Sequence, residues 1–395
     1  MKRVLTNDRI LLNPKSGVRV YLEQLLAHWP ERPAVELVGM FTQVIGRRRS
    51  MPAAPFVFPD LASVEPIPLR PLPAILDRSD GLRARTVRRL RPMLYAMDGA
   101  LVRGVSRVTR YCGFFEPNHI PLANLRPTVT TVHDLSVLDT PQFHPPQRVT
   151  HWRKHLERAV EWTAHWICIS EATAGALHRL LGIARERITV IPLASRWSDP
   201  PPEWTPQRVR SALHLPDRYL VCLSTIEPRK NILRLLDAYG RLDADRRRRV
   251  RLVLAGAAGW GDDDFWESLR AHPMAQSVLA TGYLSDGQTA AVVAAACAMV
   301  YPSLYEGFGL PPLEAMSLGV PTAVSTAPSL VEVCGDAALR VDAEDTEAWT
   351  DAMLLLSEAD DKRNDLIERG RERAAAYSWR VTAQCHHDVL DRVTG

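Results

Sequence analysis

Short apolar runs alternate with segments of helical period through the second half of the chain. The apolar, β-branched runs predict strands at residues 219–225, 250–256, 278–284, 298–304, 322–325 and 339–342. Helical patterns follow them at residues 232–239, 264–271, 286–296, 312–318, 329–333 and 346–357. This alternation is typical of a parallel sheet with crossover helices, so it predicts one doubly wound α/β domain.

The first half is less regular, but its pattern favours a second α/β domain. Buried strands are predicted at residues 129–132, 166–170 and 188–192, and helices at 17–28 and 171–181. The stretch SDPPPEWTP, residues 198–206, is polar and rich in proline, so it predicts the break between domains. We therefore expect domains at 1–198 and 199–377, followed by a helix at 378–395. The period leaves open whether that last helix packs on the second domain or crosses back to the first.

Composition fits a folded soluble protein of two domains. The chain has 395 residues, of which 46% are hydrophobic and 24% charged. Six scattered cysteines give neither a metal-binding spacing nor a disulfide framework. The N-terminus lacks the pattern of a signal peptide, and the longest apolar run, residues 290–301, is shorter than the roughly 20 residues that span a bilayer. These features predict a cytoplasmic protein.

Charge is nearly balanced overall but concentrated in one stretch. The net charge of +4 is too small to indicate a nucleic-acid partner. Residues 78–110 hold nine Arg against two Asp, a local excess of seven positive charges. This basic stretch could hold the protein reversibly on an anionic membrane surface, or it could be a solvated helix face.

The densest chemical motif is YPSLYEGFGLPPLEAMSLGVP, residues 301–321. Glu306 follows a predicted strand in a loop with Gly307 and Gly309, and a proline pair then opens a helix whose first turn is expected to hold Glu314. The glycines allow close approach of a ligand to the backbone, and free N–H groups at a helix start suit a phosphate. The carboxylates could accept hydrogen bonds from sugar hydroxyls. The alternative for Glu314 is a carboxylate that stabilises the helix dipole.

Two adjacent cations, Arg229 and Lys230, follow the first strand of the same predicted domain. They lie in STIEPRKN, residues 224–231, at the strand end where open α/β sheets bind ligands. Together they could neutralise a diphosphate. The alternative is a pair of solvated charges, although cations at a helix start oppose its dipole.

Three further patterns favour structural roles over chemistry. Residues 262–264, three consecutive Asp, are predicted to start a helix rather than bind a metal. Residues 256–259, GAAG, lack a full dinucleotide fingerprint and are predicted to form a turn after a strand. Ser170 and Glu171 are predicted to cap a helix.

Together these motifs resemble the retaining glycosyltransferases of family 4. The resemblance runs through Ser-Gly at 16–17, TVHDL at 131–135, ISEAT at 169–173, LVLAGAAGW at 252–260, GYLSD at 282–286 and the block around Glu306 and Glu314. It covers nearly the whole chain. It implies the α/β GT-B fold, in which two Rossmann-like doubly wound domains face a central cleft.

The resemblance also implies roles for individual residues. His133 and Glu306 would lie at the transferred sugar, and Glu314 at the ribose hydroxyls of the donor. The other donor-binding positions would be Gly17, Arg229, Lys230, Gly307, Phe308, Gly309 and Leu310 at the diphosphate, and Gly282, Tyr283 and Leu284 at the base. For His133 the alternative is a helix cap. The chain departs from the family at Ser224-Thr225, where Gly-Arg is frequent, and in SGVRVY near the start.

The implied function is transfer of a hexose or deoxyhexose from a nucleotide diphospho-sugar to a glycan hydroxyl with retention, with no metal and no cofactor. GDP-mannose is the first expectation for the donor, with dTDP-rhamnose and UDP-hexose behind, because the pattern resembles bacterial mannosyl- and rhamnosyltransferases of surface-polysaccharide assembly. A lipid-linked acceptor and peripheral attachment to the inner face of the cytoplasmic membrane through residues 78–110 are expected. The alternatives are a sugar-nucleotide epimerase and a catalytically silent sugar-nucleotide-binding subunit.

Overall fold

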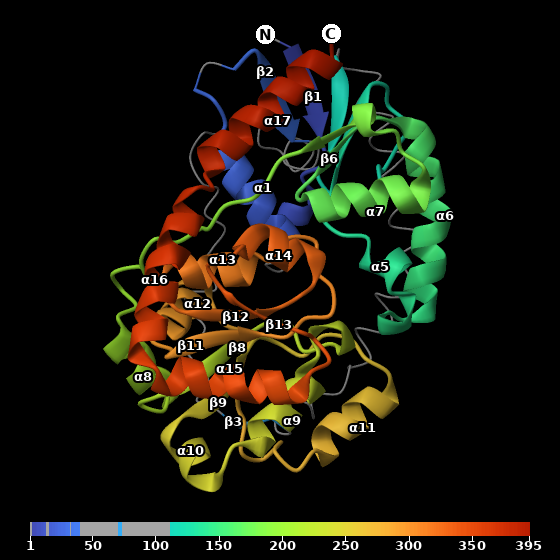
Figure 1. Ribbon diagram of the computed structural model, residues 1–395. Coiled ribbons are helices and arrows are strands. Elements are labelled where there is room, and N and C mark those ends of the chain that lie inside the picture. The colour runs from blue at the N-terminus through green and yellow to red at the C-terminus, as the bar shows by residue number, and fades with distance from the viewer. Residues whose placement is uncertain (1, 13–15, 32, 40–69, 73–110) are drawn as a thin grey trace.

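The computed structural model describes residues 2–12, 16–31, 33–39, 70–72 and 111–395, which form two α/β domains (Figure 1). The N-terminal sheet has six parallel strands in the order β2-β1-β4-β5-β6-β7. Its strands are β1 (Lys2–Thr6), β2 (Val35–Gly39), β4 (Gly113–Glu116), β5 (Thr128–Val132), β6 (Thr163–Cys168) and β7 (Ile188–Val190). Its helices are α1 (Gly17–Ala27), α5 (Ser136–Asp139), α6 (Pro146–Trp162) and α7 (Glu171–Leu181).

The C-terminal sheet has the order β13-β12-β11-β8-β9-β10-β3, and all pairs except the last are parallel. Its main strands are β8 (Tyr219–Leu223), β9 (Arg251–Ala255), β10 (Leu279–Gly282), β11 (Ala298–Tyr301), β12 (Thr322–Ser325) and β13 (Leu339–Val341). Its helices are α8 (Pro206–Leu213), α9 (Ile232–Arg241), α10 (Ala244–Arg249), α11 (Asp263–Ala271), α12 (Asp286–Ala294), α13 (Leu310–Ser317), α14 (Pro328–Cys334), α15 (Thr346–Glu358) and α16 (Asp360–Ala375).

One strand of the C-terminal sheet comes from the first half of the chain. The short β3 (Arg70–Pro71) pairs antiparallel with β10, and Leu72 is fully buried in the core of the C-terminal domain. The domain boundary predicted at residue 198 does not account for this pairing. A two-residue strand leaves no periodic pattern in the sequence from which it could be predicted.

All six strands predicted in the second half are present; β12 has the predicted bounds and the other five are shorter than predicted. The first half was predicted less completely: β1, β2, β4 and the 17-residue α6 were missed. Helix α6 reads PQRVTHWRKHLERAVEW and buries only Leu156 and Ala159, so its apolar stripe is too narrow to stand out. Cys168 and Cys222 are buried free thiols.

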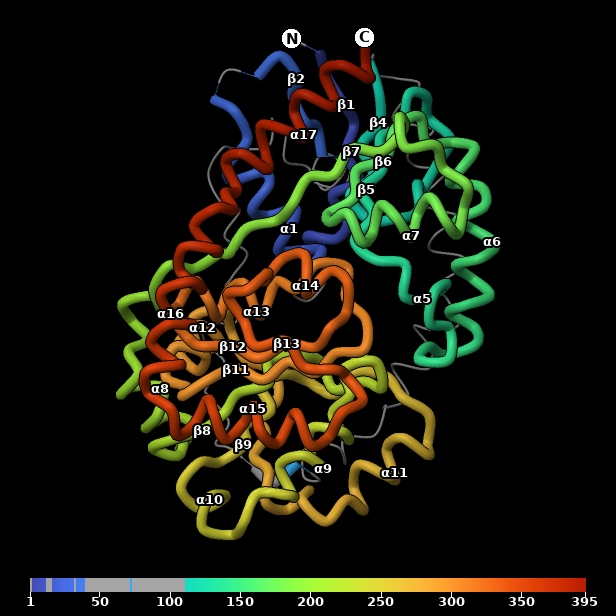
Figure 2. Tube along the Cα trace, in the orientation of Figure 1, coloured from blue at the N-terminus to red at the C-terminus, as the bar shows by residue number. Residues whose placement is uncertain are grey.

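The last two helices run along both domains (Figure 2). Helix α16 packs on α13, whereas α17 (Trp379–Val393) packs on α1 and β2 of the N-terminal domain. In α17, His386 Nε2 lies 2.7 Å from the hydroxyl of Tyr21, and Asp391 forms an ion pair with Lys2. The chain therefore ends beside the strand on which it begins.

The domains also meet directly, where α7 of the first lies against α14 of the second. The Glu332 carboxylate of α14 accepts the backbone N–H groups of Glu171 and Ala172, at 2.8 and 2.9 Å. Ser170 caps α7 by accepting the Thr173 N–H, as predicted. A helix start in one domain is thus capped by a carboxylate from the other.

The structure bears on the expectation about membrane-spanning segments but not on the expectation about the basic stretch. In the part of the chain that is described, no helix has both the length and the apolar character needed to cross a bilayer. The basic stretch, residues 78–110, lies outside the described residues.

Candidate active site

The predicted cations and Glu306 lie where the strand order of the C-terminal sheet reverses. Strand β8 has β9 and then β10 on one side, and β11, β12 and β13 on the other. Arg229 and Lys230 lie on a 3₁₀ turn that follows β8, and Glu306 lies in the loop that follows β11. Because β8 and β11 are neighbours, their carboxyl ends form the crevice where open α/β sheets bind ligands.

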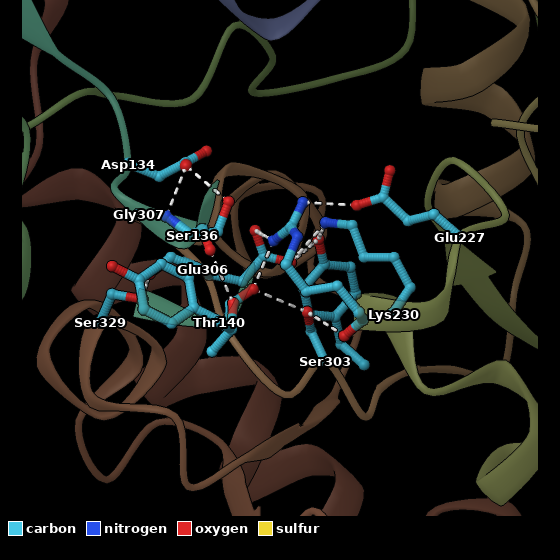
Figure 3. A network of polar contacts seen from close by, with 12 residues as sticks. Asp134, Ser136, Thr140, Glu227, Lys230, Ser303, Glu306, Gly307 and Ser329 are labelled. Atoms are coloured by element: carbon cyan, nitrogen blue, oxygen red, sulfur yellow. Dashed lines mark hydrogen bonds and ion pairs between the residues drawn. The ribbon is translucent and has the colours of Figure 1, made fainter. Parts of the chain in front are cut away.

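These three side chains form a buried ion network (Figure 3). Lys230 Nζ contacts Glu306 Oε1, which also accepts a hydrogen bond from the Tyr301 hydroxyl at 2.9 Å. Arg229 donates to Glu306 Oε2 at 3.2 Å and to Glu227 at 2.7 Å. Arg229 and Lys230 are only 7% and 8% exposed, so the alternative of a pair of solvated charges is wrong.

The network keeps Glu306 charged. Burial raises the pKa of the Glu306 carboxyl, but Lys230 and Arg229 outweigh burial and lower that pKa to about 2. Both Glu306 oxygens are engaged by protein donors. Arg229 Nε, in contrast, is a buried donor without a hydrogen-bond partner among the described residues. An unsatisfied buried donor of this kind costs about 1–3 kcal/mol.

Gly307 lies in close contact with the N-terminal domain. A Cβ at Gly307 would lie 1.7 Å from the His133 carbonyl oxygen. The Gly307 carbonyl oxygen accepts hydrogen bonds from Ser170 Oγ at 2.6 Å and from Thr173 Oγ1 at 3.0 Å. The sequence predicted close approach to a ligand here. The structure shows that this glycine is required by the contact between the domains.

The start of α13 differs in two ways from the prediction. The helix begins at Leu310, two residues earlier than expected, after Gly309 with φ of +108°. The next two residues are prolines, which have no N–H, so this helix start offers fewer donors to a phosphate than predicted. Phe308 is buried in the core against Tyr377, so only backbone groups of this segment could reach a ligand.

Glu314 consequently lies in the second turn of α13 and not the first, which weakens the helix-dipole alternative. It is 1% exposed and is held by Arg196, whose guanidinium donates to both carboxylate oxygens at 2.6 and 3.2 Å. Arg196 also donates to Asp286 at 3.0 Å. This arginine comes from the segment that joins the domains.

His133 follows β5 in the N-terminal domain and is 8% exposed. Its Nε2 lies 2.8 Å from the Pro117 carbonyl oxygen, and the Tyr21 ring packs edge-on at 4.7 Å between centroids. Because a carbonyl only accepts, Nε2 carries the proton and Nδ1 has the free lone pair. Burial lowers the pKa of His133 to about 4, so the imidazole is neutral at pH 7.

The alternative role for His133, a helix cap, is wrong. The N–H of Ser136, the first residue of α5, is accepted by Asp134 Oδ1 at 3.0 Å. The backbone N–H groups of His133 and Asp134 both donate to His119 Nε2, at 3.1 and 3.2 Å. His119 therefore fixes the backbone of this segment.

The remaining predicted donor residues lie around this centre. Gly17 is the first residue of α1, exposed and capped by Ser16, and a Cβ there would meet nothing within 4 Å. Gly282 ends β10 with φ of +68°, Tyr283 is 49% exposed, and Leu284 packs on the core. Their roles stay predictions.

Sequence reasoning missed four side chains of the site: Asp134, Arg196, Glu227 and Tyr301. Asp134 and Glu227 stand inside quoted motifs, TVHDL and EPRKN, and each follows or precedes a predicted site residue. Arg196 has no motif of its own, because its partners are about 90 and 118 residues away in the sequence. Only the fold could reveal that contact.

Of the other patterns, the predicted helix start is confirmed, since Asp262 Oδ1 accepts the Phe265 N–H at 2.8 Å and caps α11. The turn predicted at residues 256–259 is wrong, because Gly256, with φ of +142°, and Ala258 instead form isolated β-bridges with Gly282 and Ile226. Within the described ranges, no group of three or more His, Cys, Asp and Glu side chains could hold a metal ion.

Comparisons with known proteins agree with this architecture. A family model described as "Glycosyl transferases group 1" matches residues 205–373, and one described as "Glycosyltransferase Family 4" matches residues 15–194. The O-antigen chain mannosyltransferase B of Escherichia coli is 36% identical over 270 residues, which cover 67% of this chain and 70% of that protein. The serotype-specific mannosyltransferase WbdA of Escherichia coli is 32% identical over 202 residues, 47% of this chain but only 23% of that protein.

Among solved structures, sucrose-phosphate synthase from Thermosynechococcus elongatus has a similar fold. The TM-score is 0.67, with 16% identity and 99% of both chains covered. This likeness concerns the two-domain GT-B architecture.

Proposed function

Since the chain belongs to the family 4 glycosyltransferases, we propose that it moves a hexose or deoxyhexose from a nucleotide diphospho-sugar to a hydroxyl of a glycan acceptor, with retention at the anomeric carbon. GDP-mannose is the proposed donor. The relative that supports this choice is named a mannosyltransferase of the O-antigen chain and is 36% identical.

In the proposed reaction the bond from the anomeric carbon to the β-phosphate oxygen breaks, and a bond from that carbon to the acceptor oxygen forms. The acceptor proton passes to the leaving phosphate oxygen on the same face of the sugar. The products are a nucleoside diphosphate and a lengthened glycan. Arg229 and Lys230 would stabilise the charge of the leaving group, and His133 and Glu306 would orient the transferred sugar.

The observation that carries the proposal is the position of Arg229, Lys230 and Glu306 at the reversal of strand order, with the adjacent Gly307 against the His133 carbonyl of the other domain. Two buried cations suit a diphosphate, and a fixed carboxylate suits sugar hydroxyls.

A panel of sugar nucleotides tests the donor. GDP-mannose should raise the melting temperature more than dTDP-rhamnose or UDP-glucose, because a ligand that binds only the folded state stabilises it. Product analysis then separates the alternatives. An epimerase converts the donor without an acceptor, and a silent binding subunit releases no nucleoside diphosphate. Either result would overturn the proposal.

We propose that transfer needs no metal ion, because Arg229 and Lys230 can meet the charge of the leaving group. Activity should then survive EDTA. A loss that Mg²⁺ or Mn²⁺ restores would contradict this and direct attention to the carboxylates at residues 262–264.

A lipid-linked acceptor and a peripheral site on the membrane are proposed from the basic stretch at residues 78–110. Each Arg near an anionic surface contributes about 1 kcal/mol, and this attraction is screened by salt. Wild type should sediment with anionic liposomes at low salt. A variant with Arg85, Arg88, Arg89 and Arg91 changed to Gln should sediment less. Equal sedimentation of both proteins, or of neither, would remove this part of the proposal.

A further inference from the structure

Asp134 lies at the centre of the site but has no role in the scheme above. It follows His133 directly, and a Cβ built on Gly307 would lie 2.9 Å from the Asp134 Cβ. Asp134 also interacts electrostatically with Arg229 of the other domain. Figure 3 shows its carboxylate beside Gly307 and Ser136, across the network from Glu227 and Lys230. Asp134 is therefore adjacent to His133, which is proposed to orient the sugar, and interacts with Arg229, which is proposed to stabilise the leaving group.

One oxygen of Asp134 is firmly anchored. Oδ1 accepts the Ser136 N–H at 3.0 Å and the Ser136 hydroxyl at 2.7 Å. Since the Ser136 hydroxyl donates its only hydrogen to Asp134, it accepts from His144 Nε2 at 3.1 Å. The backbone N–H of Asp134 donates to His119. Two histidines thus hold both the backbone and, through Ser136, the carboxylate.

The second oxygen is different. Oδ2 has no hydrogen-bond partner among the described residues, whereas both oxygens of Glu306 and of Glu314 are engaged. Burial raises the pKa of the Asp134 carboxyl, but Arg229 and the Ser136 hydrogen bonds outweigh burial and hold it well below its usual range. Asp134 therefore presents a charged and unpaired oxygen at pH 7.

The charge on this oxygen suits the proposed reaction. Three carboxylates, those of Glu227, Glu306 and Asp134, interact with Arg229, and a further cation, Arg148, lies near His119 and His144. Of the three carboxylates, Asp134 is the one without an ion pair to Arg229 or Lys230 among the described residues. A reaction that separates charge needs both signs: cations for the leaving diphosphate, and an anion for the sugar, whose anomeric carbon and ring oxygen become positive as the bond breaks.

We propose that Asp134 is a further catalytic residue, whose free carboxylate oxygen faces the transferred sugar and stabilises the positive charge that develops on it. The inference rests on the proposed function. No bond forms to Asp134 and no proton moves to it. Its carboxylate acts through charge while the bond to the phosphate oxygen lengthens.

The decisive variant is Asp134→Asn, which keeps the shape and the oxygen that Ser136 needs but removes the charge. The kcat for transfer should fall about 100-fold, as is typical when one preorganised group that stabilises a transition state is removed. Affinity for GDP, measured by the shift in melting temperature, should be unchanged or tighter, because a negative charge near the diphosphate is gone. Slow hydrolysis of the donor without acceptor should fall in parallel, since it develops the same charge on the sugar.

The matched control is Asp139→Asn, which removes a carboxylate five positions away that pairs with the surface residue Arg179. It should leave kcat unchanged. Should Asp134→Asn not fold, Ser136→Ala decides instead: the carboxylate stays but loses its anchor, and kcat should fall about 10-fold with GDP affinity retained.

Three results would overturn the inference. One is a kcat within threefold of wild type in Asp134→Asn. Another is a fall in kcat that is matched by equal losses of GDP affinity and melting temperature, which would indicate a structural role. The third is loss of transfer with donor hydrolysis unchanged, which would place Asp134 at the acceptor. Absence of transfer by wild type itself, with any sugar nucleotide, is a distinct result that removes the proposed function.

Discussion

The two domains bring opposite kinds of polar group to the boundary between them. The C-terminal domain contributes charge: Arg229, Lys230 and Glu306 form ion pairs while buried. The N-terminal domain contributes mainly neutral imidazoles. Burial lowers the pKa of His133 to about 4 and that of His119 to about 3. Asp134 is a charged residue on that side, as is Arg148, whose guanidinium lies 4.5 Å from the centre of the Trp260 ring of the C-terminal domain.

This difference suggests a division of labour. A diphosphate needs fixed positive charge, which the C-terminal domain holds ready even without a ligand, because Glu306 keeps both cations in place. Sugar hydroxyls need uncharged donors and acceptors, and a neutral imidazole such as His133 offers an acceptor without attracting a phosphate. The division requires both halves to meet, and Gly307 is the position beside the ion network at which they do.

The substitution expected to disrupt the contact between the two halves most strongly is therefore Gly307→Ala. The added methyl group would collide with the His133 carbonyl, 1.7 Å from the ideal Cβ, so the domains must move apart. Transfer should fall by about 100-fold or more, since displacements near 1 Å have that effect. GDP should still raise the melting temperature, because the cations belong to the C-terminal domain.

Gly175→Ala is the control for that variant. Gly175 lies in α7, and a Cβ there meets nothing within 4 Å, so transfer should be unchanged. Wild-type transfer by Gly307→Ala would show that the domains need not meet as they do here.

Glu306→Gln tests the charged half. The change leaves two buried cations without their shared carboxylate, and breaking a buried ion pair in this way costs about 3–5 kcal/mol. We expect a drop of that size in the free energy of unfolding in urea, and a fall in kcat of about 100-fold. Glu186→Gln, at an exposed position, is the control. A variant as stable as wild type would mean that the cations do not depend on Glu306.

The buried neutral histidines are tested by the pH dependence of the free energy of unfolding. The pKa values of His119, His133 and His386 are lowered to about 3, 4 and 4, so the unfolded chain binds more protons than the folded one between about pH 4 and 6.5. Stability should therefore fall as pH drops through this window, by about 1.4 kcal/mol per unit for each histidine. Burial raises the pKa of Glu116 to about 8, which acts in the opposite sense and offsets one of them from pH 4.5 upward.

Urea denaturation at several pH values measures this slope. His386→Gln keeps an acceptor for the Tyr21 hydroxyl but cannot be protonated, so the slope should become shallower. His28→Gln, which removes an exposed imidazole, should leave it unchanged. A slope that is the same in all three proteins would contradict neutral burial of His386.

The sequence predicted the charged half better than the neutral half. Arg229, Lys230, Glu306 and Glu314 stand in short motifs after regular strands, so their approximate positions followed from strand ends alone. The surroundings of His133 could not be predicted, because Tyr21, whose ring packs on His133, and His386, which contacts the Tyr21 hydroxyl, lie on helices at opposite ends of the chain. Polar helices such as α6 give no strong period, and contacts such as Arg196 with Glu314 depend on how the domains meet. What was missed is long-range packing.

The smallest expected effect concerns the one place where the N-terminal domain is predicted to approach the diphosphate. Gly17 begins α1 without any atom within 4 Å of its Cβ position, so Gly17→Ala should change the free energy of unfolding by no more than about 0.5 kcal/mol. If the donor lies against this helix start, the methyl group takes space that the diphosphate needs, and KM for the donor should rise severalfold with kcat little changed. Steady-state kinetics at varied donor concentration measure both. An unchanged KM would mean that the C-terminal domain alone binds the diphosphate, and the division between a charged and a neutral half would then be complete.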